Sequence, residues 1–343
     1  MEVRTWLEQV MADARAHADP HDLTGLDESF ERRLHREGGA LGWLALESEA
    51  LAAFHFEVAR ADAPLVDTAA TLVAPVLRSE RPALLERVLA GEVTACIAYT
   101  EAGAGSDLTA IETVAEEDAG TWTLRGTKVL VTAAHKADWC VTIARTDTDA
   151  APREGMSMFL VDMGAPGVRV ERQTTMNGWD LGDIHFAGAE AELIGGRNGG
   201  WRQLVTAVAA ERSGMFWLGF ARRVLDLLVD HVRQHDDPLA RDEVGRLDAE
   251  WWAAEALCWR VVRTPDDPVL ASIAKIVTTE LLQDLAQTAS ELAGPAGVVW
   301  APLFGDPAGR FAYEYLERVH GTISVGANEV QRDTIARLGL GMR

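Results

Sequence analysis

The 343-residue sequence has few cysteines and no long apolar run, and each of these absences excludes a class of protein. Its three cysteines, Cys96, Cys140 and Cys258, are odd in number and lack the spacing of metal ligands, so we expect a reducing cytoplasm and no metal site. Cys96 and Cys140 lie in apolar β-type runs, where we expect core thiols. No stretch of about 18 consecutive apolar residues exists, so no membrane helix is predicted. The N-terminal segment MEVRTWLEQVMADAR lacks a basic stretch followed by an apolar one, so no signal peptide is predicted and a cytoplasmic location is expected.

Positive charge is also in short supply. Lys and Arg number 32 against 53 Asp and Glu, and the formal net charge of -21 is spread along the chain rather than gathered in a tail. This excess argues against binding to nucleic acid or to an anionic membrane surface. The length suffices for two or three cores at roughly 100 to 200 residues per domain, and the chain has no internal repeat or low-complexity segment. A multidomain enzyme is predicted.

The order of the secondary-structure patterns predicts an α+β fold rather than alternating βαβ units. Apolar positions recur at helical spacing up to residue 91, β-branched runs broken by Gly, Asp and Pro fill residues 93–192, and helical patterns return from residue 198. We therefore predict three domains: a helical domain at 1–92, a β domain at 93–195 and a helical bundle at 196–343. The expected helices of the bundle are residues 201–233, 242–263, 269–292 and 310–319.

Residues 95–107, ACIAYTEAGAGSD, hold a candidate ligand-binding loop. The apolar residues 96–99 predict a buried strand, and Gly103 and Gly105 allow a ligand to approach the backbone without obstruction by a Cβ atom. Thr100 and Ser106 place hydroxyls at the two ends of the loop. Further β-type runs follow at 126–132, 137–147 and 156–162, with a hairpin-like segment at 122–131.

Together with the C-terminal segments GANEVQR at 326–332 and IARLGLG at 335–341, these stretches resemble the acyl-CoA dehydrogenase family. The usual sequence motifs of this family are TEPGAGSD, then G-x-K-x-W/F-I-T-N, then GTSEIQR. The motifs of this chain occur in the same order across nearly its full length. The resemblance implies an N-terminal helical domain, a central barrel-like β domain and a C-terminal four-helix bundle, with bound FAD. It also implies α,β-dehydrogenation of an acyl thioester, electron transfer to an electron-transfer flavoprotein, and a homo- or hetero-oligomer of such chains.

The implied reaction needs a carboxylate that removes the α proton while hydride passes to the flavin, and donors that hold the thioester oxygen. In the family these donors are a flavin ribityl hydroxyl and a backbone N–H, here in the Val325–Gly326 region. The commonest base of the family is a Glu at the position of Val325. Some branches place the base in a Glu-Arg pair on the first long helix of the bundle, which maps it to Glu211, with Arg212 toward coenzyme A. An ordinary surface ion pair at Glu211–Arg212 is the alternative.

The resemblance also assigns the cofactor contacts, with departures from the family pattern. Thr132 is expected to hydrogen-bond the flavin ring, whereas Leu130 stands where many relatives have Trp. A neighbouring subunit normally adds Arg and Phe from R-x-x-F-G, of which Arg233 remains, and Glu291 replaces a Gln in the element that contains Gly294. Ser106 is also expected to contact substrate. The expected FAD contacts are Tyr99, Thr100, Gly105, Ser106, Leu130, Val131, Thr132, Arg233, Gly294, Ala327 and Glu329.

Three functions remain open at this point. The first is a self-sufficient dehydrogenase, the second is a non-catalytic or half-site subunit of a heteromeric complex, and the third is an oxidase that uses oxygen. After Gly42 the chain lacks a loop that commonly walls the acyl pocket, which predicts a bulky acyl group or a carrier-protein thioester, unless only a surface loop is shortened. His320 is expected to be a surface or capping residue, and Trp217, Trp251 and Trp252 to lie in the core or a subunit interface.

Overall fold

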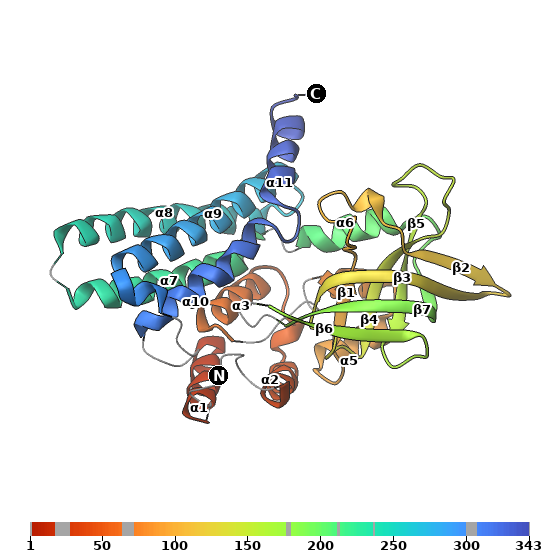
Figure 1. The fold of residues 1–343 in the computed structure, drawn as a ribbon, viewed down its shortest axis with the longest axis horizontal. Coiled ribbons are helices and arrows are strands. Elements are labelled where there is room, and N and C mark those ends of the chain that lie inside the picture. The colour runs from red at the N-terminus through yellow and green to blue at the C-terminus, as the bar shows by residue number, and fades with distance from the viewer. Residues whose placement is uncertain are drawn as a thin grey trace. The chain divides into compact units, whose positions relative to one another are not determined.

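The computed structural model describes residues 2–17, 28–63, 72–175, 180–210, 213–235, 237–299 and 307–342 (Figure 1). By contacts between residues, the chain divides into two compact units. One, the helical unit, comprises Met1–Leu34, Leu46–Leu65 and Arg212–Arg343; the other, the β unit, comprises His35–Ala45 and Val66–Glu211. Helices, then strands, then helices follow one another in separate blocks, as the predicted α+β class requires, whereas the three domain boundaries stay a prediction. Among the described residues, no helix combines the length and the apolar character that a membrane span needs.

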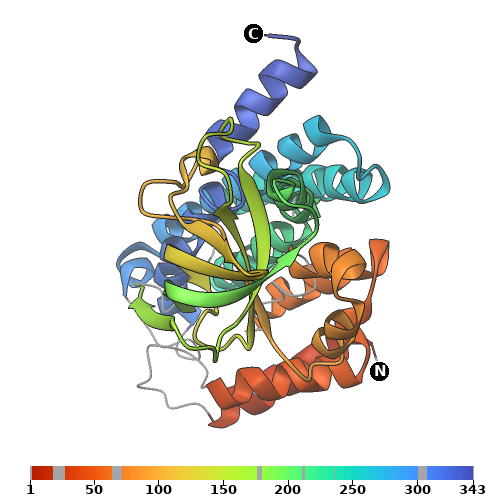
Figure 2. The same ribbon diagram turned by 90° about the vertical axis from the view of Figure 1, so that its right-hand side faces the viewer.

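The helical unit is a bundle of long helices that lie side by side (Figures 1 and 2). Its core consists of buried aliphatic side chains such as Leu218, Leu225, Leu247 and Leu282. The N-terminal helices α1 and α3 pack on each other, and α3 packs on α7. The helices are α1 (Val3–His17), α2 (Glu28–Ala40, which crosses into the β unit), α3 (Ser48–Ala61), α7 (Met215–Arg233), α8 (Pro238–Arg263), α9 (Pro268–Leu292), α10 (Pro307–Arg318) and α11 (Asn328–Thr334).

The two longest helices begin at Asp-Pro pairs. Asp237 accepts hydrogen bonds from two backbone N–H groups at the start of α8, and Asp267 does the same for α9. Proline has no backbone N–H, and at the first helical position such a group would have no acceptor within the helix. The residues at each start therefore determine where the helix begins. The single helix predicted at 201–233 is wrong, because α6 ends at Ala210 and α7 begins at Met215 after Gly214, which has a φ of 78°. This left-handed residue interrupts the helical hydrogen bonding although the apolar spacing continues.

The β unit contains a closed sheet, whose strands curve and twist in Figure 2. In the described part of the chain the seven-stranded sheet has the order β1-β4-β2-β3-β7-β5, with β6 on β7, and an additional pairing of β4 with β5 closes the ring. Closure leaves few exposed strand edges. The elements are α4 (Ala74–Glu80), α5 (Pro82–Leu89), β1 (Ala95–Ala98), β2 (Val114–Asp118), β3 (Thr121–Thr132), β4 (Trp139–Arg145), β5 (Met156–Asp162), β6 (Val168–Thr174), β7 (Asp180–Ile194) and α6 (Gly200–Ala210).

The hairpin-like segment predicted at 122–131 is instead one continuous strand, β3. The turn lies before it, at Ala119 and Gly120, which both have positive φ as a two-residue hairpin turn requires. Gly126 marks a close approach rather than a turn, since a Cβ atom there would lie 2.7 Å from the Cα atom of Thr113. The predicted burial of Cys96 and Cys140 is confirmed, and Cys258 is buried as well.

A buried cluster of charges ties α3, α7 and α10 together within the helical unit. Glu314 is fully buried and accepts hydrogen bonds of 2.8 Å from both Arg223 and Arg318. Asp62, just beyond α3, pairs with Arg310, Arg223 and Arg318. Burial alone would raise the pKa of each carboxyl, but the surrounding guanidinium groups hold both pKa values below their usual range. The cluster is therefore charged at neutral pH.

Replacing Glu314 with Gln is expected to lower the free energy of unfolding by about 3 to 5 kcal/mol, because buried guanidinium groups lose their countercharge. Urea unfolding measures this change. Glu243→Gln is the matched control, since Glu243 pairs with Arg246 on the exposed surface of α8, and it should change stability far less. Equal effects of the two substitutions would contradict a structural role for the cluster.

The lowered pKa values of Asp62 and Glu314 determine in which direction the stability of the fold changes with pH. Carboxyls whose pKa is lower in the folded chain contribute stability above their unfolded pKa, about 4, and lose that contribution as the pH falls below it. The wild type should therefore lose stability steeply below about pH 4, whereas Glu314→Gln should show a shallower loss over the same range.

Candidate active site

The structure brings together the two segments of the β unit that the sequence assigns to flavin contacts. Tyr99 and Thr100 follow the end of β1, and the carbonyl oxygen of Thr100 accepts a hydrogen bond of 2.9 Å from the N–H of Val129 in β3. The ammonium of Lys128 lies 3.5 Å from the carbonyl oxygen of Tyr99. The start of the glycine loop and the end of β3 are thus joined through their backbones.

A buried ion pair fixes this junction. Glu101 accepts a hydrogen bond of 2.7 Å from Lys128, whose side chain is fully buried, and further bonds from the N–H groups of Glu112 and Thr113. Although burial alone would raise it, the pKa of Glu101 is lowered by the ammonium of Lys128 and by these donors. Burial lowers the pKa of Lys128, against the opposing effect of Glu101. One carboxylate therefore holds three segments of the chain at the base of the loop.

The glycine loop itself leaves room for a ligand. Glu101 and Ala104 close the loop through reciprocal backbone hydrogen bonds of 3.1 and 3.0 Å, and Gly105 and Ser106 are exposed. A Cβ atom built on Gly105 would meet nothing within 4 Å, and this residue has no positive φ. The fold of this chain therefore does not itself demand glycine at 105, whereas the close approach of a bound molecule would.

A β-bulge at the end of β3 turns Leu130 outward. The pairing of β3 with β7 shifts between Lys128 and Val131, and Leu130 has a φ of 56° and a 59% exposed side chain. Its N–H donates to Asp183 at 3.1 Å. The side chain of Val131 is buried in the sheet core, so only its backbone is left to contact a ligand. Thr132 is half-buried. Bulges commonly re-aim a side chain beside a site, and a left-handed leucine is strained.

The C-terminal loop of the helical unit also has a strained backbone. Val325 and Gly326 have φ values of 53° and 85°, and a branched residue such as valine rarely adopts the left-handed conformation. The carbonyl oxygen of Gly326 accepts a hydrogen bond of 3.0 Å from Gln331. Ala327 is buried at the start of α11, whereas Glu329 is exposed and pairs with Arg332 at 3.5 Å.

His320, for which a surface or capping position is expected, lies near this loop and is half-buried. Its ring contacts the edge of Trp217, and its Nδ1 atom lies 2.6 Å from the carbonyl oxygen of Glu317. Burial lowers the pKa of His320 to about 4, and the charges of Arg318 and Lys275 act in the same direction. His320 is therefore neutral at pH 7. Trp217 and Trp251 lie in the core as expected, and Trp252 is 58% exposed.

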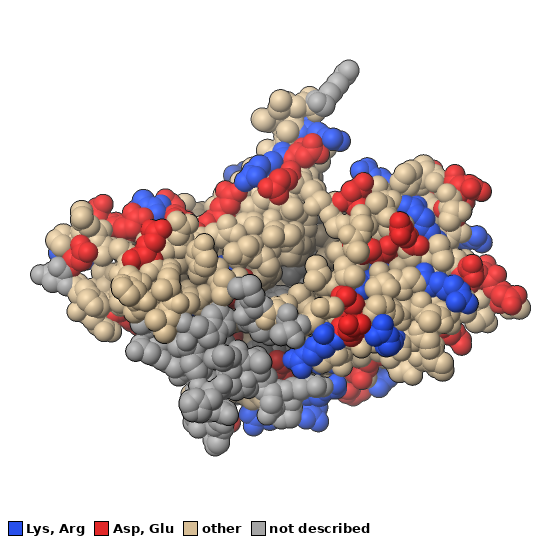
Figure 3. Space-filling view, viewed as in Figure 1, with Lys and Arg blue, Asp and Glu red and all other residues tan. Residues whose placement is uncertain are grey.

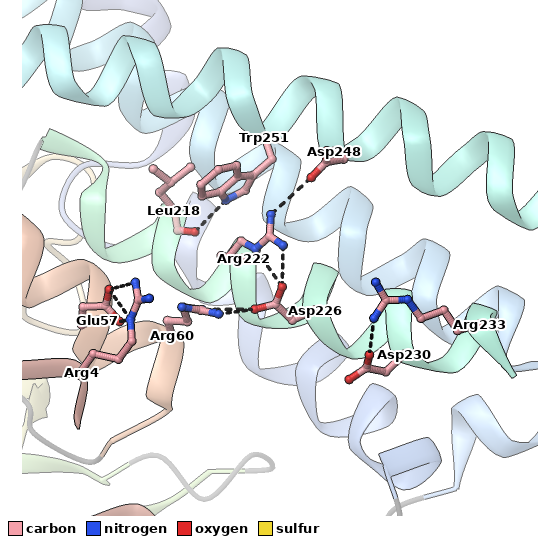
Figure 4. Close-up of polar contacts among 10 residues, drawn as sticks. All are labelled: Arg4, Glu57, Arg60, Leu218, Arg222, Asp226, Asp230, Arg233, Asp248 and Trp251. Carbon is pink, nitrogen blue, oxygen red and sulfur yellow. Dashed lines mark hydrogen bonds and ion pairs between the residues drawn. The ribbon is translucent and has the colours of Figure 1, made fainter. Parts of the chain in front are cut away.

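Arg233 and Gly294 lie at the far end of the bundle. Arg233 is exposed at the end of α7 and pairs with Asp230 on the preceding turn at 3.3 Å, as Figure 4 shows. A hydrogen bond between His231 and the backbone of Leu292 joins this helix end to the end of α9, where Glu291 accepts from Gln287. Gly294, with a φ of 58°, follows directly in a 3-10 helix at Gly294–Val298.

The predicted contacts of the helical unit thus fall into two groups at opposite ends of α9. Asn328, directly after the C-terminal loop, binds Lys275 near the start of α9. Gly294 lies just beyond Glu291, which is sixteen residues after Lys275 on the same helix. At 1.5 Å per residue this separation is about 24 Å, too far for a single ring system to touch both groups. Glu211 and Arg212 lie outside the described residues. Within the ranges described above, no three His, Cys, Asp or Glu side chains gather as a metal site.

Sequence reasoning missed four residues that hold the candidate site: Glu101, Lys128, Lys275 and Asn328. All four are buried. Charged and amide side chains are ordinarily assigned to the surface, and the partners of each pair are far apart in the sequence. The available signal was the position of Glu101 and Lys128 inside the two family motifs, each next to an apolar strand.

Comparisons with known proteins confirm the predicted family. The model of the acyl-CoA dehydrogenase middle domain matches residues 96–189, and the model of the C-terminal domain of the same family matches residues 198–340. Acyl-CoA dehydrogenase IpdE1 of Mycobacterium tuberculosis is 30% identical over 99% of this chain and 96% of its own. The chain belongs to the acyl-CoA dehydrogenase family. These are flavoprotein oxidoreductases that act on CH–CH bonds.

Solved structures confirm the acyl-CoA dehydrogenase fold, with N-terminal helices, a central β-barrel and a C-terminal helical domain. A variant of the steroid acyl-CoA dehydrogenase Tcur3481-Tcur3483 superimposes with a TM-score of 0.88 at 25% identity, over 99% of this chain and 98% of that one. The ChsE4-ChsE5 complex from Mycobacterium tuberculosis gives 0.89 at 23% identity, over 99% of this chain and 96% of that one. Acyl-CoA dehydrogenase FadE29 from the same organism is 30% identical over 89% of this chain and 83% of its own.

Lys128→Met is expected to lower the free energy of unfolding by about 3 to 5 kcal/mol, because the buried carboxylate of Glu101 loses its countercharge. Adding Glu101→Gln should recover part of this loss, which urea unfolding of the two variants will show. Arg125→Met, on the same strand but in an exposed ion pair of 3.9 Å, is the control and should change stability by less than about 1 kcal/mol. A double variant less stable than Lys128→Met would refute the pairing.

Proposed function

We propose that this chain carries out FAD-dependent α,β-dehydrogenation of a bulky acyl thioester. The observation that carries the proposal is the junction of Thr100 with Val129, braced by the buried pair of Glu101 and Lys128. Here the exposed glycine loop and the outward Leu130 supply the features that a flavin ring needs, which are a backbone without Cβ obstruction and an apolar surface. The residues present therefore fit FAD.

The reaction divides among few groups. FAD supplies the hydride acceptor, and the rest of the task belongs to the protein. Glu211 is the candidate base that removes the α proton, since Val325 carries no carboxylate. The backbone N–H of the Val325–Gly326 region is the candidate donor to the thioester oxygen, and this role does not depend on the side chain at 325. Arg212 and Ser106 are the candidate contacts to the coenzyme A part of the substrate.

Two observations favour a bulky acyl group. The short 3-10 helix Trp43–Ala45 is followed after two residues by α3, which begins at Ser48, so no extended loop intervenes where relatives commonly wall the acyl pocket. One similar structure, Tcur3481-Tcur3483, is a steroid acyl-CoA dehydrogenase. A polycyclic acyl-CoA is therefore a better candidate substrate than a short straight-chain one. An electron-transfer flavoprotein is the proposed acceptor, and oxygen uptake during turnover would instead identify an oxidase.

The purified chain is expected to carry bound FAD whose visible absorption bleaches when a steroid-ring acyl-CoA is added without oxygen. Butyryl-CoA should bleach it at least about tenfold more slowly, because a pocket shaped for a polycyclic group binds a short chain with less apolar contact. Glu211→Gln should keep FAD bound and lose bleaching, since an amide cannot accept the α proton. The spectrum before and after substrate addition measures all three outcomes.

A gain of function sharpens this test. Val325→Glu in the Glu211→Gln background places a carboxylate at the family's commonest base position, and Glu is less strained than Val in the left-handed conformation. It should restore part of the bleaching. Bleaching that survives in Glu211→Gln alone would remove Glu211 as the base, and fast use of butyryl-CoA alone would overturn the bulky substrate.

The chain's second candidate function is that of a half-site subunit in a heteromeric complex. Arg233 is the candidate contact to the dinucleotide part of FAD bound by a neighbouring subunit, yet it is paired with Asp230, and Asp237 and Glu291 flank the same end of the bundle. A carboxylate near a pyrophosphate weakens its binding. Two similar structures, Tcur3481-Tcur3483 and the ChsE4-ChsE5 complex, have two components each. Substoichiometric FAD in the isolated chain would favour this function.

The surface of the helical unit supports assembly with another chain. The segment Ile335–Gly339 after α11 is joined to that helix by the ion pair of Arg337 with Asp333, and further apolar side chains follow it. In Figure 3 the part of the molecule that projects at the top carries blue and red side chains with tan ones above them. Leu338, Leu340 and Met342 are 64%, 71% and 59% exposed. Clustered exposed apolar side chains are typical of protein interfaces. We infer that a second acyl-CoA dehydrogenase chain, identical or related, covers them.

The double substitution Leu338→Asp/Leu340→Asp is expected to shift the assembly to a smaller species in sedimentation velocity, because charge would be buried in the interface. The measurement is made on the purified chain and on the chain together with any copurifying partner. Leu239→Asp is the control, since Leu239 is 81% exposed at the start of α8, away from this segment. An unchanged sedimentation coefficient in the double variant would remove the segment from the interface.

A further inference from the structure

The C-terminal loop is anchored to α9 by side chains that the proposed chemistry does not use. Five of them are almost fully buried, with exposed fractions of 2% or less, although all are polar. Buried polar groups of this kind are expensive unless they are satisfied, and when satisfied they define a single local geometry. They are Ser272, Lys275 and Thr279 on α9, and Asn328 and Gln331 on α11.

Two branches make up this anchor. In the first, the ammonium of Lys275 donates to Oδ1 of Asn328 at 2.7 Å, and the Nδ2 of Asn328 donates to the Oγ1 of Thr279 at 3.2 Å and to Glu280 at 3.2 Å. The second runs from Ser272, which donates to Oε1 of Gln331 at 2.8 Å.

The second branch reaches the strained peptide directly. The Nε2 of Gln331 donates to the carbonyl oxygen of Gly326 at 3.0 Å, and a Cβ atom on Gly326 would lie 2.6 Å from that nitrogen. The carbonyl oxygen of Gly326 is therefore fixed from one side, two residues before Asn328 is fixed by Lys275. A backbone held at both points can keep Val325 at a φ of 53°, a conformation that costs about 1 to 3 kcal/mol.

We propose that Lys275 with Asn328, and Ser272 with Gln331, are positioning pairs that aim the backbone N–H groups of Val325 and Gly326 at the thioester oxygen. This inference rests on the proposed dehydrogenase function. The pairs do not touch the substrate. They hold the loop in one conformation, which matters more here than in relatives with a carboxylate at 325, because only the backbone of that residue remains to take part in the reaction.

The first test measures the loop without any ligand. Lys275→Met removes the donor to Asn328 and keeps the length of the side chain, and it should speed amide hydrogen exchange in the peptide that covers residues 324–331 by at least about tenfold. Thr278→Val is the matched control, because Thr278 is as buried on α9 but bonds only to carbonyl oxygens of its own helix. Unchanged exchange in Lys275→Met would overturn the proposal, whether or not the chain proves to be a dehydrogenase.

A second test asks whether the ordered loop serves the reaction. With the steroid-ring acyl-CoA, Lys275→Met should lower kcat by about 10- to 100-fold and change KM by less than about threefold, as expected when a donor to the developing charge is misaligned. Thr278→Val should stay within about twofold of the wild type. Faster exchange with unchanged kcat would reject the role in catalysis. A wild type that binds FAD but never bleaches would reject the dehydrogenase function and leave the exchange result standing.

A milder variant covers the case in which Lys275→Met does not fold. Ser272→Ala removes one hydroxyl and leaves no buried charge, so the fold should survive. It should release Gln331 and produce a smaller change in the same direction in both measurements. The double variant Ser272→Ala/Lys275→Met, if stable, should lose little more than Lys275→Met alone, because both branches hold the same loop. Ser272→Ala with wild-type exchange and kcat would overturn the second pair.

Discussion

The candidate site depends on the cost of burying an ammonium group. The chain contains three lysines among its 32 basic residues, Lys128, Lys136 and Lys275, and all three are buried. An isolated buried charge is too expensive to persist, so each such lysine requires acceptors in a fixed geometry. In the β unit Lys128 meets that requirement through Glu101, and in the helical unit Lys275 meets it through Asn328. Glu101 lies in the glycine loop, and Asn328 begins α11 directly after the C-terminal loop, so each partner lies in or next to a loop whose backbone the chemistry would use.

These anchors explain how strained backbone persists at both loops. Leu130 and Val325 have positive φ, which neither side chain favours, and Leu130 is not held by its own packing, since it is largely exposed. The conformations are imposed by neighbours: Asp183 binds the N–H of Leu130, and Gln331 binds the carbonyl oxygen of Gly326. Strain of this kind survives only where surrounding contacts over-determine the backbone.

Patterns among residues close together in the sequence predicted more of the fold than of the candidate site. The apolar spacing in α8 and α9 and the buried strand before the glycine loop follow from neighbouring residues, so sequence patterns found those elements. The start of α8 at Pro238 nevertheless lies before the predicted helix at 242–263. The break before α7 was missed because apolar spacing continues through Gly214, and Gly126 predicted a turn although its role is the approach of Thr113. The pair of Glu101 and Lys128 joins residues 27 apart, and its burial depends on the closed sheet, which no local pattern encodes.

The geometry of Val325 bears on whether this loop is still functional. A loop that had lost its purpose along with its carboxylate would be free to relax, and the simplest relief is to move a β-branched residue out of the left-handed region. The chain instead keeps Val325 there, followed by a glycine, and retains two buried polar branches that hold the next residues. Since the backbone N–H of Val325 does not depend on a carboxylate side chain, the retained conformation supports a donor role for that backbone. The proton acceptor must then come from elsewhere, from Glu211 of this chain or from a partner.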